Sequence, residues 1–79
     1  MDSNLKNLLA DVFGLRPSEI TETLTKDDID SWDSLKQMDL VMSLERTYNI
    51  QLDIRDIIQM VSVDSIINVI KKKGIKLEN

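Results

Sequence analysis

The residues able to do chemistry in this chain of 79 residues are few in kind, because it contains neither cysteine nor histidine. Disulfides, thiolate nucleophiles, imidazole bases and the usual zinc sites are therefore excluded together. Carboxylates, hydroxyls and amines remain. The composition therefore favours a protein that is not an enzyme.

Four aspartates precede residue 34 and raise the question of calcium binding: Asp27, Asp28, Asp30 and Asp33. The EF-hand loop needs a central glycine and a terminal glutamate at fixed positions, and this segment has neither. We therefore interpret these residues as a solvated acidic loop and expect no metal site.

Ser34 stands at the predicted start of a helix over about 34–48. Taken alone, it would be the cap of that helix, with Gln37 three residues later in the spacing of a capping box. Asp33 would then complement the helix dipole. Spacing by itself assigns these residues no further role.

Two apolar stripes run along this predicted helix. One is sufficient to bury it, and consists of Leu40, Val41, Leu44 and Tyr48. The other begins beside Ser34 and is surplus to that burial: Leu35, Met38 and Met42. Since methionine at helical spacing more often fills a core than an interface, core filling is the alternative for the second stripe.

A first helix is predicted over about 3–13, with Ser3 as its N-cap and Gly14 as the glycine that ends it. Its apolar residues recur at i, i+3, i+4, i+7 and i+8: Leu5, Leu8, Leu9, Val12 and Phe13. Residues 15–33 then form a long connection, in which Pro17 could open a short turn. We expect this connection to be ordered, because its apolar residues can reach the core: Leu15, Ile20, Leu24, Ile29 and Trp32.

The last third of the chain predicts a short third helix, about 54–60, and a fourth that Ser62 caps and Gly74 ends. Their apolar residues are Ile54, Ile57 and Ile58, then Val63, Ile66, Ile67 and Ile70. The expected fold class is therefore all-α. It is a small four-helix bundle, with three main helices, a short third helix and a long ordered loop between the first two.

Length and charge limit the remaining possibilities. A chain of 79 residues predicts a single domain, 1–79, and we expect a monomer. The net charge of −4 disfavours nucleic acid as a partner. Four lysines near the end, Lys71, Lys72, Lys73 and Lys76, are expected to complement a helix dipole. No apolar run could span a bilayer, and the first residues lack a secretory signal, so we expect a cytoplasmic protein without stable membrane insertion.

Several segments together resemble the signature of the acyl carrier protein family. The first runs from Ile29 to Leu35 and contains Asp-Ser-Leu at residues 33–35, and an apolar-acidic-Leu-Val-Met-x-Leu-Glu run follows over residues 38–45. Residues 48–53 resemble the family's aromatic-x-Ile-x-Ile/Leu segment that leads to an Asp, and residues 60–63 resemble the family's opening of the last helix. The resemblance covers nearly the whole chain, in order and at the family's spacing.

The resemblance implies that Ser34 receives 4′-phosphopantetheine from coenzyme A, within a motif completed by Asp33 and Leu35. A phosphopantetheinyl transferase, normally with Mg²⁺, would make this attachment. The thiol of the arm would hold acyl groups as thioesters, which accounts for a carrier without cysteine. The protein would then be a substrate of acyl-loading and acyl-processing enzymes, with no catalytic residue of its own.

Two further sets of residues follow from the resemblance. The surface for partner enzymes would lie on the helix over 34–48 and comprise Leu35, Lys36, Met38, Asp39, Met42, Glu45 and Arg46. An acyl pocket between the second and third helices would be lined by Leu40, Val41, Leu44, Ile57 and Ile66.

The sequence also departs from the family pattern. Residues 34–48 contain two acidic and two basic side chains, for a net charge of zero, whereas typical members carry a strongly acidic helix here. Lys36 follows the Asp-Ser-Leu motif directly. The pathway is therefore left open between fatty acid synthesis and a specialised lipid or polyketide-type pathway. A peptidyl or D-alanyl carrier is a further alternative. A different class of protein, an unmodified helical interaction module, could use the same surface.

Overall fold

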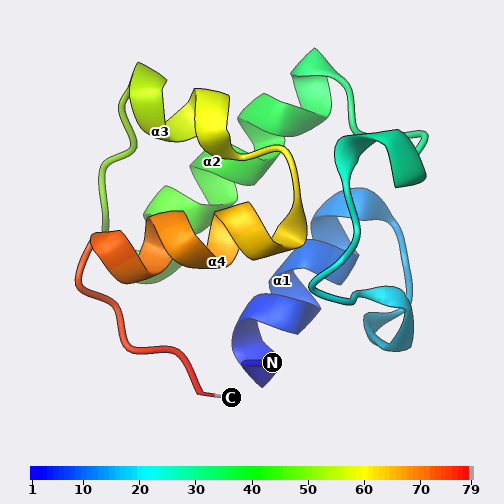
Figure 1. Ribbon diagram of the computed structural model, residues 1–79, viewed down its shortest axis with the longest axis horizontal. Coiled ribbons are helices and arrows are strands. Elements are labelled where there is room, and N and C mark those ends of the chain that lie inside the picture. Colours follow the sequence, from blue (N-terminus) through cyan, green and yellow to red (C-terminus); the bar gives the residue numbers. More distant parts are fainter. Residues whose placement is uncertain (79) are drawn as a thin grey trace.

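Four α-helices form the protein in a computed structural model that describes residues 1–78 (Figure 1). Their bounds are α1 Ser3–Phe13, α2 Ser34–Tyr48, α3 Ile54–Gln59 and α4 Val63–Lys72. Two short 3-10 helices, η1 Pro17–Glu19 and η2 Lys26–Asp28, lie between α1 and α2. The all-α prediction is confirmed, and the part of the chain that the structure describes contains no strand beyond one isolated bridge, Thr25 to Ser62.

The start of α1 differs from the prediction. Asp2, not Ser3, is the N-cap, and one of its carboxylate oxygens accepts from the amide of Leu5 at 3.0 Å. The other oxygen accepts from the amide of Glu78 at 3.0 Å. These two hydrogen bonds hold the pKa of Asp2 below its ordinary value. At the other end of α1, Gly14 adopts a left-handed conformation with φ of 68° and ends the helix as predicted.

The apolar core is formed by one face of α1, α2 and α4 together with residues of the long connection. Its most completely buried side chains are Leu5, Leu9, Ile20, Leu40, Leu44, Met60, Val63, Ile66, Val69 and Ile70. Burial of each large apolar side chain contributes about 1.5–3 kcal/mol, so these three helices are held mainly by the hydrophobic effect.

The long connection is ordered, as predicted. Ile20, Ile29 and Trp32 are buried, while Leu15 and Leu24 are half-buried. Its backbone is fixed to the segment between α3 and α4, because the amide of Lys26 donates to the Val61 carbonyl at 3.0 Å and the amide of Val63 donates to the Leu24 carbonyl at 2.9 Å. These contacts join the long connection to the segment before α4.

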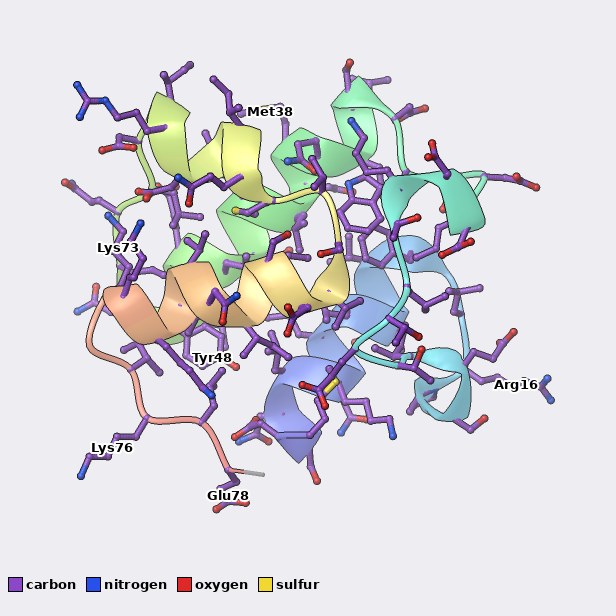
Figure 2. All side chains as sticks on the ribbon, viewed as in Figure 1. Arg16, Met38, Tyr48, Lys73, Lys76 and Glu78 are labelled. Carbon is purple, nitrogen blue, oxygen red and sulfur yellow. The ribbon has the colours of Figure 1, made fainter. Side chains whose placement is uncertain are left out.

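The short helix α3 is attached by different means. Figure 1 shows it beside α2 and α4, at the end of the bundle away from the long connection. Its one buried residue is Asp56, and its isoleucines Ile54 and Ile58 are 70% and 69% exposed. The ammonium of Lys73 lies 2.8 Å from an oxygen of Asp56, so an ion pair joins α3 to the end of α4 (Figure 2).

The terminal lysines therefore differ in their roles. Lys71 and Lys72 lie in the last turn of α4, as predicted. Cations there interact favourably with the negative end of the helix dipole. Lys73 instead pairs with Asp56, a contact between helices that its place in the sequence did not indicate.

None of the helices within residues 1–78 is long and apolar enough to cross a membrane. The cytoplasmic location stays a prediction.

The ion pair at α3 predicts a pH-dependent contribution to stability. The hydrogen bond from Lys73, and next the one from the amide of Asp53, hold the pKa of Asp56 below its ordinary value. Because the folded state favours the carboxylate, this contribution is present at neutral pH and lost as the pH falls through that lowered pKa. Replacing Lys73 by methionine, which keeps the apolar stem, should lower Tm by roughly 4 °C at pH 7.

Thermal unfolding from pH 7 to pH 3 tests this expectation. The difference in Tm between wild type and K73M should narrow over the acidic end of the range. The matched control is K72M, because Lys72 is exposed on the same turn and forms no ion pair within the described residues. Equal losses of Tm in K73M and K72M would contradict the assignment.

Candidate functional site

Ser34 is the first residue of α2 and is exposed to solvent. The prediction that it caps the helix is wrong, because Asp33 is the N-cap and its carboxylate accepts from the amide of Lys36 at 2.9 Å. The predicted capping box is also wrong, since the side chain of Gln37 bonds elsewhere. The hydroxyl of Ser34 is therefore not needed by the helix.

The surroundings of Ser34 suit the attachment of an anionic group. Among residues 1–78, its hydroxyl has no hydrogen-bond partner, and the same is true of the amides of Ser34 and Leu35. These two amides open onto solvent at a helix N-terminus, where N–H groups and the helix dipole favour negative charge. The site thus offers an oxygen for attachment and donors for a phosphodiester, which fits phosphopantetheine.

The two residues before Asp33 anchor the site to α1. The ring of Trp32 is buried and lies 4.6 Å from that of Phe13, centroid to centroid, at an interplanar angle of 38°. The hydroxyl of Ser31 donates to the carbonyl of Phe13 at 3.2 Å. An aromatic pair of this kind contributes about 0.5–1.5 kcal/mol beyond its buried area. The end of α1 therefore fixes the position from which α2 starts.

Gln37 joins three parts of the structure through its side-chain amide. Its Oε1 accepts from the indole Nε1 of Trp32 at 2.6 Å. Its Nε2 donates to the carbonyls of Ile57 at 3.0 Å and Met60 at 3.1 Å, at the end of α3. Sequence reasoning missed this role.

The sequence nevertheless contains a signal for the position of Gln37. It precedes the buried residues Leu40, Val41 and Leu44 by three, four and seven positions, so it lies on the inward face of α2. A polar side chain on that face needs partners, because burying it unpaired costs free energy.

The second apolar stripe of α2 faces outward. Leu35 is 84% exposed, and Met38 and Met42 are also largely exposed, so the alternative that they fill the core is wrong. Figure 2 shows Met38 projecting from the body on the side where α3 lies. The helix α3 adds Ile54 and Ile58 as further exposed apolar side chains, which the predicted partner surface did not include.

The charged residues of α2 are used in different ways. The ammonium of Lys36 lies 3.9 Å from an oxygen of Asp39, a loose pair in the first half of the helix. Glu45 is turned towards the protein, where its carboxylate accepts from the amide of Leu52 at 2.9 Å. Arg46 is exposed. Lys36, Asp39 and Arg46 therefore remain available to a partner more than Glu45 does.

The residues predicted to line an acyl pocket belong to one cluster. Leu40, Val41, Leu44 and Ile66 are buried in the core, and Ile57 of α3 is half-buried and packs against it. The cluster lies along the inward face of α2, which begins at Gln37, one turn after Ser34.

Two of the four clustered aspartates act as caps. The carboxylate of Asp28 accepts from the amide of Thr25 at 2.9 Å and from its hydroxyl at 3.1 Å, closing η2. Asp33 caps α2. Their carboxylates thus have structural partners within the chain.

The assignment of the cap to Asp33 gives a direct test. D33A should lower the free energy of unfolding by about 0.5–2 kcal/mol, whereas D33N, which keeps the accepting oxygen, should lose much less. S34A should change it by less than about 0.5 kcal/mol, because no described contact is removed. Urea denaturation of the three variants measures these differences. A loss in S34A equal to that in D33A would contradict the assignment.

Comparisons with known proteins agree with this geometry. Residues 3–70 match the family described as "Phosphopantetheine attachment site". The chain is 33% identical to an acyl carrier protein of Buchnera aphidicola over 91% of this chain and 92% of that one. It is 31% identical to an acyl carrier protein of Thermotoga maritima, over 90% and 88% of the two chains.

A solved structure supports the same conclusion. The solution structure of a holo acyl carrier protein from Geobacter metallireducens superposes with a TM-score of 0.79, at 30% identity, over 90% of this chain and 82% of that one. These matches decide against an unmodified helical interaction module. The chain therefore belongs to the acyl carrier protein family, whose members carry a covalently attached 4′-phosphopantetheine.

Proposed function

We propose that Ser34 is the attachment residue and that this chain presents acyl groups from that position to partner enzymes. One observation carries the proposal, namely the exposed hydroxyl of Ser34 at the start of α2, which has no hydrogen-bond partner among residues 1–78. The arm, when attached, supplies a terminal thiol that holds acyl groups as thioesters. The chain itself contains no cysteine that could do so.

The chain's own residues position Ser34 and do not activate it. No described side chain lies within hydrogen-bonding distance of its hydroxyl to take the proton, so a base of the transferase must do so. The carboxylate of Asp33 caps the helix, and the buried Trp32 fixes the preceding backbone. The hydroxyl is thus presented outward as a substrate.

We expect the wild-type chain to gain the mass of one phosphopantetheine on incubation with coenzyme A, Mg²⁺ and a broad-specificity transferase. S34A should gain none, and its retained helical circular dichroism would show that it is folded. The control is S18A, which removes an exposed serine hydroxyl without side-chain hydrogen bonds in the described structure. Intact mass gives the answer, and modification of S34A at another serine would overturn the attachment site.

The partner surface proposed for the carrier is centred on the outward stripe of α2. Leu35, Met38 and Met42 offer apolar contacts close to Ser34, and methionine adapts to surfaces of different shape. Lys36, Asp39 and Arg46 would lie at the rim of these contacts. The partners that this proposal requires are the transferase and enzymes that load or process the acyl group.

We propose further that an acyl chain can be stored in the core beside α3. The candidate lining is the cluster of Leu40, Val41, Leu44, Ile57 and Ile66. Each buried methylene contributes about 0.8 kcal/mol, so the apolar cluster favours a hydrocarbon cargo.

The charge of α2 supports a specialised pathway over general fatty acid synthesis. The two basic residues, Lys36 and Arg46, balance Asp39 and Glu45, and Glu45 is occupied by the amide of Leu52. A partner with a basic patch would meet Lys36 beside the reactive serine, and like charges oppose docking. An enzyme with acidic groups opposite Lys36 and Arg46 fits this surface better.

The double variant K36E/R46E tests this part of the proposal. It should increase the rate with general fatty-acid elongation enzymes about tenfold at low salt, and much less at high salt, because exposed charges are screened. K72E/K76E is the control, since it makes the same change in net charge on residues outside α2. Equal rates for the wild type and K36E/R46E at every ionic strength would contradict the proposed charge mismatch.

A further inference from the structure

The attachment of α3 depends on a few polar contacts. Ile54 and Ile58 point outward, and Asp56 is its one buried residue. Apolar burial therefore contributes less to holding α3 than it does for α1, α2 and α4. At its start α3 is joined to α4 by the pair of Asp56 with Lys73, and at its end two carbonyls accept from Gln37 of α2.

The orientation of the Gln37 amide is determined by its three partners. The indole N–H of Trp32 is a donor only and requires the oxygen Oε1, at 2.6 Å. Nε2 is then directed at the carbonyls of Ile57 and Met60, which can only accept. The side chain thus joins the anchor before Ser34 to the end of α3.

The hydrogen bonds of Gln37 lie between Ser34 and the apolar core. Gln37 lies one helical turn after Ser34, and the inward face of α2 continues from it to Leu40, Val41 and Leu44. Ile57, whose carbonyl Gln37 holds, packs half-buried against the same cluster. The direct path from Ser34 along the inward face of α2 to that cluster runs past Gln37.

We propose that Gln37 is a positioning residue that closes the seam between α2 and α3 and so controls whether an acyl chain on Ser34 is buried or presented outside. This inference rests on the proposed attachment at Ser34. Burial of the chain requires the hydrogen bonds from Gln37 to Ile57 and Met60 to break. Removal of these hydrogen bonds lowers the cost of burying the chain.

The isosteric variant Q37E separates this role from simple packing. Its carboxylate still accepts from Trp32 but has no proton to donate to the carbonyls of α3. Q37A removes all three hydrogen bonds and is the second variant. The control is Q59A, because Gln59 is an exposed residue of α3 whose side chain forms no hydrogen bond within the described part of the chain.

The experiment compares Tm of the phosphopantetheine form with that of its octanoyl thioester for wild type, Q37E, Q37A and Q59A. Loading at the same residue is confirmed by intact mass. Emission from Trp32, the sole tryptophan, shows that the site remains folded. We expect octanoylation to raise Tm by at least about 4 °C more in Q37E than in wild type or Q59A.

Q37A should show the same enlarged shift if it folds, and Q37E alone decides the question if it does not. Equal octanoyl shifts in Q37E, wild type and Q59A, whether large or absent, would overturn the role of Gln37 while leaving the carrier function intact. Failure of wild type to load at Ser34 would overturn the proposed function itself, and the role of Gln37 with it.

Discussion

Trp32 must bury a large apolar ring while its indole N–H still reaches an acceptor. The structure meets both demands with two contacts, the ring of Phe13 at the end of α1 and the amide oxygen of Gln37 in α2. These contacts fix the end of the long connection between α1 and α2. Ser34, two residues later, is placed at the surface as a result, and the amide of Gln37 is turned so that its nitrogen faces α3. The exposure of the Ser34 hydroxyl is thus linked to the burial of Trp32 two residues earlier.

The helices of the bundle are held in place by two kinds of interaction. α1, α2 and α4 share an apolar core, where attraction is proportional to buried area and does not depend on direction. α3 is held chiefly by an ion pair and by hydrogen bonds, which depend on distance and angle. The attachment of α3 therefore depends on the geometry of a few polar contacts, whereas that of the other helices is spread over many apolar side chains. This difference makes α3 the element of the bundle that a few side chains can control.

Periodicity predicts the helices of this chain well, because α1 and α2 carry apolar residues at a regular 3.6-residue spacing. It also identifies the outward stripe of Leu35, Met38 and Met42. The sequence predicts Ser3 and Ser34 as the caps of α1 and α2, but in each case the preceding aspartate takes that position. Serine and aspartate are equally good caps, so sequence alone does not decide between neighbours. The cap of α4 at Ser62 has no such competitor and was predicted correctly.

The contacts of Gln37 with Ile57 and Met60, and that of Lys73 with Asp56, could not be predicted, since these partners lie far away in the sequence. The two apolar stripes of α2, by contrast, are both visible in its sequence. Its inward side chains hold the fold, while the exposed stripe beside Ser34 contributes little to the core. Substitutions in that stripe are therefore nearly neutral for folding, and under the proposed function they are selected by the partner enzymes. A duplicated copy of such a chain can diverge towards a new pathway one residue at a time, without passing through an unstable intermediate sequence.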